Sequence, residues 1–86
     1  QDIDPKAPIH ILVIPKKHIR SINELKRSDK TIAGELLLAA QKISEIEEIN
    51  ESGFRTIFNT NDDGGQTVYH IHMHIMGGRK MTWPPG

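Results

Sequence analysis

Histidine alternates with apolar residues over positions 70–74, which read His-Ile-His-Met-His. Successive side chains of an extended strand point to opposite faces, so the three imidazoles would share one face while Ile71, Met73 and Ile75 share the other. Imidazole is also the side chain whose charge changes most readily near neutral pH. The pattern predicts a strand over residues 68–76 that carries titratable groups opposite a core face.

Two other segments have the composition of strands. Residues 10–14 are apolar and rich in β-branched side chains between two prolines, which predicts a buried strand. Residues 54–59 predict a further strand, and a turn-rich loop at 61–65 leads from it into the histidine segment.

One long helix is expected between these strands. It should begin near Ser28 or Asp29, which are good caps, and end near Gly53, a natural left-handed terminator. A short helical turn over residues 21–26 should begin at a Ser cap. The apolar stripe of the long helix comprises Ile32, Leu36, Ala39, Ile43 and Ile46, and is widened by Leu37, Leu38, Ala40 and Ile49.

The width of this stripe has two explanations. The helix is either thickly covered within one core or part of a dimer interface. A chain of 86 residues buries only about 60–65% of the surface that it exposes when unfolded, so association would add stability. The small size therefore favours the dimer.

The charge balance and composition limit the possible partners. Lys and Arg number 11, as do Asp and Glu, so no net field attracts nucleic acid or an anionic membrane. The longest apolar run, residues 36–40, is far shorter than the roughly 20 residues of a membrane span. The absence of Cys excludes a disulfide scaffold and a thiol nucleophile, and it fits a reducing cytoplasmic or nuclear location.

Alternating histidines are also typical of zinc sites. Histidines at i and i+2 can share one ion, but those at i and i+4 lie about 13 Å apart along a strand, whereas Zn–N bonds are about 2.0–2.1 Å long. One ion cannot easily take all three. A site built from two of them with His10 or His18 is the alternative that this spacing leaves open.

The residues before the histidines favour an anion site. In the sequence Gly-Gly-Gln-Thr at 64–67, the glycines allow successive N–H groups to point inward, while Gln66 offers an amide and Thr67 a hydroxyl. Such a loop can hold a phosphate without net positive charge. A neutral imidazole facing that phosphate can attack phosphorus if its other nitrogen keeps its proton on an acceptor. His72, with a histidine on each side, is the predicted nucleophile, and its neighbours would steady the developing charge.

These motifs resemble the histidine triad family, and within it the Hint branch of purine nucleotide-binding phosphoramidases. The resemblance is carried by residues 70–76, 64–67, 10–18 and 77–79 and by the terminal Trp-Pro-Pro-Gly at 83–86. It extends along essentially the whole chain, so residues 1–86 are expected to form a single domain of this family. It implies an α+β fold, an antiparallel sheet with one long helix packed on it, and a homodimer whose contact involves the long helix and residues 54–59.

The resemblance also implies an activity, the hydrolysis of adenosine 5′-phosphoramidates through an adenylylated histidine, with no metal and no cofactor. His72 corresponds to the nucleophile and His74 to a phosphate contact, while His10 and His70 correspond to supporting histidines. The implied nucleotide contacts are Asn59, Gly65, Gln66 and Thr67 in the phosphate and ribose-side loop, Asp2 at the ribose hydroxyls, Ile3 against the base, and Trp83, which reaches the partner subunit's site.

Family members carry a helix and two strands ahead of the segment that corresponds to Asp2. The sequence opens on Gln1, directly in a turn-like segment, and does not contain these elements. We expect that residues upstream of Gln1 were removed.

Two other functions use the same residues. A sister branch with the same triad cleaves dinucleoside polyphosphates, although the Trp-Pro-Pro-Gly tail argues against it. A nucleotide-binding scaffold or regulatory module would keep the fold and the pocket without catalysis. The sequence leaves both open.

Overall fold

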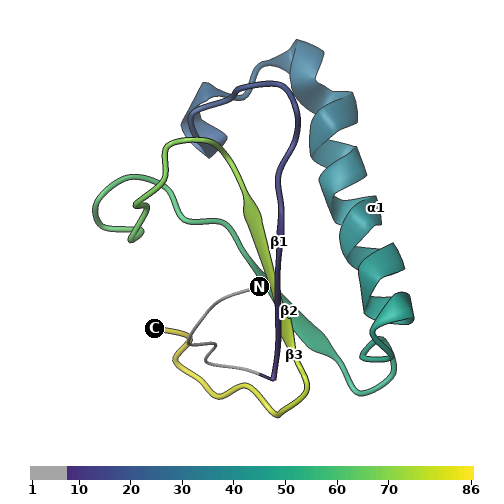
Figure 1. The fold of residues 1–86 in the computed structure, drawn as a ribbon. Helices are drawn as coiled ribbons and strands as arrows, with labels where there is room; N and C mark the ends of the chain where they lie inside the picture. The colour runs from purple at the N-terminus through teal and green to yellow at the C-terminus, as the bar shows by residue number, and fades with distance from the viewer. Residues whose placement is uncertain (1–7) are drawn as a thin grey trace.

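The computed structural model, which describes residues 8–86, contains three antiparallel strands and one long helix (Figure 1). The strands pair in the order β1-β3-β2, so the last strand in sequence lies in the middle. The expected α+β fold, an antiparallel sheet with one long helix on it, is confirmed. The elements in chain order are β1 (Ile9–Val13), the 3-10 turns η1 (Ile22–Glu24) and η2 (Arg27–Asp29), α1 (Lys30–Ile46), β2 (Phe54–Ile57) and β3 (Met73–Gly77).

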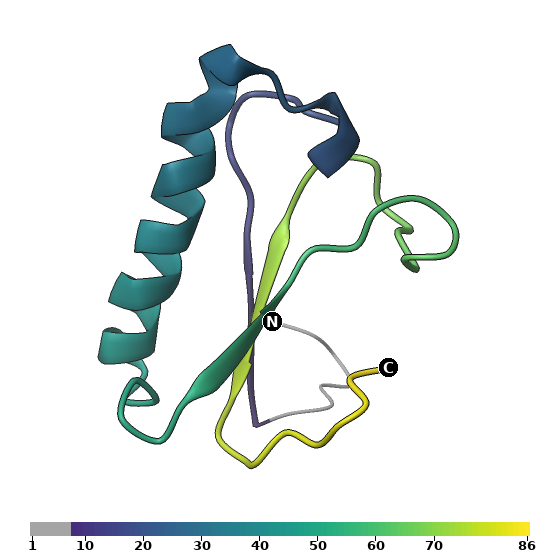
Figure 2. The ribbon, with the colours of Figure 1, turned by 180° about the vertical axis from the view of Figure 1, so that it is seen from behind.

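The two faces of the sheet differ in what covers them. Helix α1 lies along one face only, as the front and back views show (Figures 1 and 2). On that face Met73 and Ile75 of β3 are 0% exposed and pack with Ala40 and Ile49. The opposite face therefore receives the alternate residues of β3, beginning with His74.

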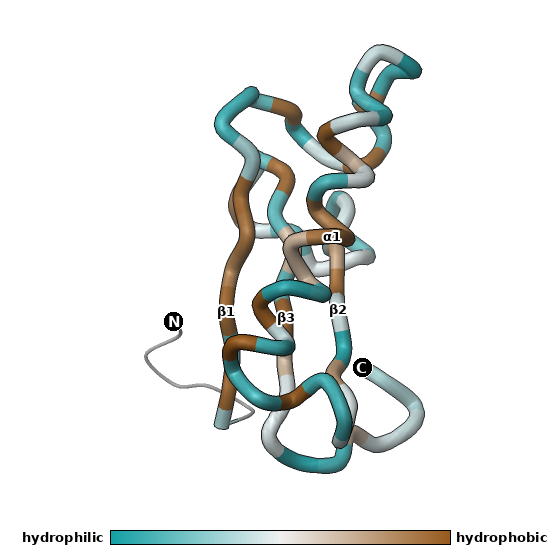
Figure 3. The backbone as a smooth tube through the Cα atoms, turned by 90° about the vertical axis from the view of Figure 1, so that its right-hand side faces the viewer, coloured by the Kyte–Doolittle hydropathy of each residue, from teal (hydrophilic) through white to brown (hydrophobic). Residues whose placement is uncertain are grey.

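The register aligns the three strands across both faces. Ile75 lies between Ile11 of β1 and Thr56 of β2 on the helix side, while His74 lies between Leu12 and Ile57 on the other side. The hydropathy-coloured tube shows the hydrophobic run of β1 at one edge of this sheet, with β3 and β2 beside it (Figure 3).

The predicted strand ends need correction. The histidine strand was predicted over 68–76, but β-pairing covers only Met73–Gly77, because β1 ends at Val13 and the chain beyond it turns away. The predicted strand at 54–59 stops at Ile57, and the one at 10–14 is shifted to Ile9–Val13. Alternating burial nevertheless extends from residue 71 to residue 77, so the predicted division into two faces is confirmed for the second half of the histidine segment.

The long helix is shorter than predicted. It begins after Asp29, as expected, but ends at Ile46 instead of near Gly53. Glu48 has a left-handed backbone with φ 58°, which stops the helix and returns Ile49 to the core, where it is 4% exposed. Gly53 is left-handed as predicted, with φ 109°, but it closes the following turn by donating to Ile49 O at 2.9 Å.

The predicted apolar stripe is only partly buried. Leu36 and Ala40 are buried, whereas Ile46 is 64% exposed and does not belong to the core. Leu37 and Leu38 are also exposed, at 61% and 62%. None of the helices within residues 8–86 is long and apolar enough to cross a membrane. The short turn η1 is capped by Ser21 as predicted, and the Ser21 hydroxyl accepts from Asn23 N at 3.2 Å, but the turn ends at Glu24 instead of residue 26.

The buried position of Ile75 in the central strand predicts a large effect on stability. Ile75→Ala should lower the free energy of unfolding by about 2–5 kcal/mol, because a cavity forms where β1, β2 and α1 meet. Urea unfolding followed by circular dichroism measures the loss. Val68→Ala, at a site that is 60% exposed, is the matched control and should change the same quantity by less than about 0.5 kcal/mol. Equal losses at the two positions would contradict the assignment of Ile75 to the core.

Candidate active site

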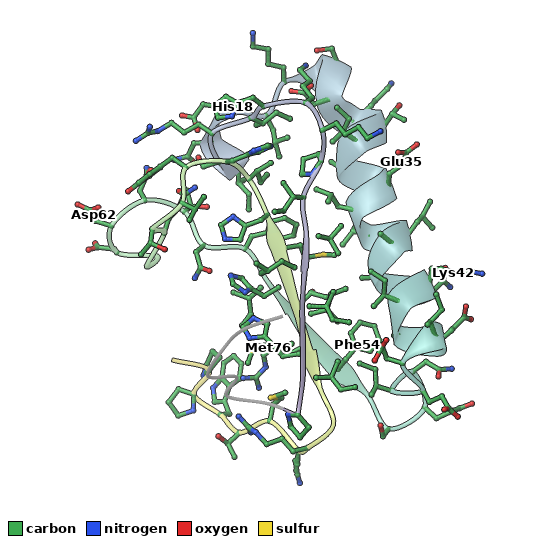
Figure 4. The ribbon with its side chains drawn as sticks, viewed as in Figure 1. His18, Glu35, Lys42, Phe54, Asp62 and Met76 are labelled. Carbon is green, nitrogen blue, oxygen red and sulfur yellow. The ribbon has the colours of Figure 1, made fainter. Side chains whose placement is uncertain are left out.

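Three imidazoles meet on the face of the sheet that α1 leaves uncovered. His10 Nε2 and His74 Nδ1 are 2.8 Å apart, and the His72 and His74 ring centroids are separated by 5.1 Å. His10 lies in β1 and His74 in β3, while His72 is the residue just before β3. Figure 4 shows the two sides of the sheet, with Phe54 toward α1 and Met76 on the opposite side. The structure thus brings together three of the four histidines that were predicted to act in catalysis.

The ring of His72 is held in one tautomer. Its Nδ1 lies 2.8 Å from the backbone oxygen of His70. A carbonyl oxygen only accepts hydrogen bonds, so Nδ1 carries the proton and donates it. In the neutral ring the lone pair is then on Nε2. This is the arrangement that an imidazole nucleophile requires.

His70 turns toward a different part of the chain. Its Nε2 lies 3.0 Å from Pro15 O and 3.3 Å from Lys17 O, in the loop that follows β1. Its ring meets His18 edge to face, with centroids 5.0 Å apart. His18 lies in that loop, beyond the end of β1 (Figure 4). His70 therefore supports His72 through its backbone carbonyl, while its own side chain binds the loop.

The glycine-rich loop uses much of its hydrogen-bonding capacity internally. Gly65 N donates to Asp62 O at 2.9 Å and Gln66 N donates to Asn61 O at 3.0 Å. The Gln66 side chain is 5% exposed; its Oε1 accepts from Asn61 N, and its Nε2 donates to Arg20 O and Val68 O. The expected presentation of these two N–H groups and of the Gln66 amide to an anion is therefore not what the structure shows. They stabilise the loop instead.

The glycine pair has a steric explanation in this loop. A Cβ on Gly64 would lie 2.4 Å from Thr60 O, and Gly65 has φ +76°, a region that side chains disfavour. Asn59 Nδ2 donates to Gly64 O at 2.7 Å and fixes the loop from within. Thr67 was also predicted to contact the nucleotide. It is exposed, so its hydroxyl lies at the surface.

The remaining predicted nucleotide contacts lie at the two ends of the chain. Asp2 and Ile3 fall outside the described residues. Trp83 is 83% exposed on the C-terminal tail, which turns back beneath the sheet (Figure 1). Arg55 Nη2 donates to Thr82 O at 3.0 Å and so ties this tail to β2.

The sequence analysis missed an ion pair between a buried carboxylate and a half-exposed lysine near the loop after β1. Asp29 is 2% exposed; its Oδ1 lies 2.6 Å from Lys17 Nζ and its Oδ2 accepts from Lys26 N at 2.9 Å. The hydrogen bond from Lys17, followed by that from Lys26 N, holds the pKa of the Asp29 carboxyl below its ordinary value. Asp29 was recognised only as a helix cap, and nothing in the sequence indicates a lysine 12 residues away as its partner.

Within residues 8–86, no group of three or more His, Asp or Glu side chains is arranged to hold a metal ion.

Comparison with known proteins shows the family of this chain. Residues 1–81 match the model of the HIT domain, so the chain belongs to the histidine triad family. It is 48% identical over 86 residues to an uncharacterized HIT-like protein of Synechococcus elongatus, covering all of this chain and 75% of that protein. It is also 48% identical over 81 residues to the purine nucleoside phosphoramidase of Escherichia coli, covering 94% of this chain and 68% of that enzyme.

Solved structures show the same fold. The crystal structure of a HIT family hydrolase from Legionella pneumophila superposes with a TM-score of 0.97 at 51% identity, covering all of this chain and 77% of that one. A histidine triad protein from Clostridium difficile gives a TM-score of 0.89 at 40% identity, covering 94% of this chain and 70% of that one. The family assignment made from the histidine motif is confirmed.

The lowered pKa of Asp29 predicts how stability depends on pH. The ionised carboxyl stabilises the folded state fully above the ordinary pKa of 3.8, and this contribution is lost as the pH falls through the lower pKa of the folded protein. Asp29→Asn should therefore destabilise the protein at pH 7 and flatten the fall in its urea midpoint below about pH 4. Lys16→Met, at the neighbouring exposed lysine, is the control and should keep the wild-type profile. Parallel profiles for wild type and Asp29→Asn would contradict this role.

Proposed function

We propose that this protein is a purine nucleotide-binding phosphoramidase that hydrolyses adenosine 5′-phosphoramidates at the P–N bond. The observation that carries the proposal is the 2.8 Å hydrogen bond from His72 Nδ1 to His70 O, which leaves the lone pair on Nε2. The name of the Escherichia coli relative, purine nucleoside phosphoramidase, supports the choice of substrate class.

The proposed reaction has two steps. His72 Nε2 attacks the α-phosphorus of the phosphoramidate, forming a new P–N bond while the bond to the leaving amine breaks. A neighbouring group protonates that amine, because an amide anion is a very poor leaving group. Water then attacks the nucleotidyl-histidine, which releases AMP and restores the neutral imidazole.

The histidines around His72 have distinct proposed roles. His74, whose ring contacts both His72 and His10, would donate to the phosphoryl oxygens as negative charge develops. The remaining proposed nucleotide contacts are Asn59, Thr67, Asp2, Ile3 and Trp83. Gly65 and Gln66 would shape the loop instead of contacting the nucleotide, because their own groups bind within it.

The proposal includes a homodimer. Strand β2 lies at an edge of the sheet, so one side of it is unpaired within the described residues. A groove between α1 and β2 runs beside this edge, lined by Leu37, Ala40, Gln41, Ser44, Phe54 and Thr56. Leu37 is 61% exposed and Phe54 37% exposed, which is apolar surface that a second copy would cover.

Removal of the proposed nucleophile should abolish turnover. His72→Ala should lower kcat for an adenosine phosphoramidate at least about a thousandfold, since no other group forms the covalent intermediate. The affinity for AMP, measured by calorimetry, should change little because the other proposed nucleotide contacts remain. Lys42→Ala, at an exposed position on the side of α1 away from the histidines, is the control and should keep kcat within about threefold of wild type.

Other results would favour the rival functions. Faster hydrolysis of a diadenosine polyphosphate than of the phosphoramidate would assign the protein to the sister branch. Tight AMP binding by a wild-type protein that hydrolyses neither substrate would favour a nucleotide-binding scaffold. Retained turnover in His72→Ala would remove His72 from the nucleophile role.

The dimer is tested by a charge in the groove. Leu37→Glu should convert the dimer to a monomer in light scattering coupled to size exclusion, because association would bury an unpaired carboxylate. Leu38→Glu changes a side chain with a similar exposed fraction, 62%, that does not line the groove, and it should remain dimeric. A wild-type protein that is monomeric at every concentration would contradict the dimer.

A further inference from the structure

His70 and His72 lie just outside the β-ladder and therefore need another support. Pairing between β1 and β3 begins at Val13 and Met73, so no ladder hydrogen bond fixes the two residues before Met73 to β1. The ring of His72 is oriented by the backbone oxygen of His70 at 2.8 Å. The position of that oxygen depends on what holds residues 70 and 71.

The loop after β1 holds this segment at several points. His70 Nε2 lies 3.0 Å from Pro15 O and 3.3 Å from Lys17 O. One residue further on, Ile71 N donates to Ile19 O at 2.6 Å. A displacement of residues 15–19 would therefore move the His70 ring, and with it the carbonyl that His72 uses.

The same loop is tied to the start of α1 by the buried carboxylate. Asp29 is fixed on one side by Lys26 N at 2.9 Å and is 2% exposed, while Lys17 reaches its other oxygen at 2.6 Å. The Lys17 side chain is 55% exposed, so it approaches this carboxylate from the surface. A buried carboxylate that lost its cation would have to rearrange, because an uncompensated charge is costly to bury.

We propose that Asp29 and Lys17 are positioning residues for His72. Their ion pair fixes the loop after β1, the loop carbonyls orient His70, and the His70 carbonyl keeps the proton of His72 on Nδ1. Neither side chain is proposed to contact the reacting atoms. The effect on rate rests on the proposed phosphoramidase function, whereas the effect on the His72 tautomer does not.

Kinetics of variants at Lys17 test the proposal in the full chain. A misplacement of about 1 Å can cost about 100-fold in rate, so we expect partial loosening in Lys17→Met to lower kcat about tenfold. KM for the phosphoramidate and the affinity for AMP should stay within about twofold of wild type, because the nucleotide contacts are unchanged. Lys17→Arg keeps the charge and should restore kcat to within about twofold of wild type. Lys16→Met is the matched control and should leave kcat unchanged.

Imidazole ¹⁵N NMR gives a readout that does not depend on turnover. The wild-type protein should show His72 in the Nδ1–H form, and Lys17→Met should show a mixture of both tautomers. A Lys17→Met protein with wild-type kcat and a wild-type His72 tautomer would overturn the proposal, even if its melting temperature fell. Should Lys17→Met fail to fold by circular dichroism, Lys17→Gln replaces it under the same criteria. A wild-type protein without turnover would contradict the proposed function, while the tautomer comparison would still decide this proposal.

Discussion

The site depends on the pairing of β3 with a strand on each side, because this pairing fixes the face of the sheet to which each β3 side chain points. The strand lies between β1 and β2, and its core-facing residues Met73 and Ile75 are fully buried against α1. Burial of each such side chain contributes about 1.5–3 kcal/mol. A slip of the register by one residue would send these side chains to the open face and the histidines into the core. The energy of core packing therefore also holds His74 on the open face.

Hydrogen bonding then gives the imidazoles different properties although they share a strand segment. A neutral imidazole has one donor and one acceptor, so the partner of one nitrogen decides the state of the other. His72 faces a carbonyl, which can only accept, whereas His74 faces the ring of His10, where one of the two nitrogens must donate. The backbone oxygen of His70 thus fixes which nitrogen of His72 carries the proton. The contact between the rings of His74 and His10 does not by itself fix this.

The sequence contained enough information to predict the two faces but not the points where the elements end. Alternation of side chains is a local property, so it correctly placed His74 opposite Ile75. The start of β3 at Met73 depends on where its partner β1 stops. That point is Val13, about 60 positions earlier in the chain. The helix ends at Ile46, and the left-handed Glu48 that follows returns Ile49 to the core, although Gly53 is the better local terminator. The Lys17–Asp29 pair could not be predicted because it joins a side chain of the loop after β1 to one at the start of α1.

The location of His72 at the end of the ladder explains how a sheet can carry such a site. Inside the ladder the backbone N–H and C=O groups bond to the neighbouring strands, and few are available to orient a side chain. Just before β3, the His70 oxygen accepts from His72 and Ile71 N donates to the loop. Segments outside the ladder open at lower free energy than the core does. The contacts of this loop therefore bear chiefly on the orientation of His72, while the largest contributions to global stability come from Met73 and Ile75, although these residues are neighbours in sequence.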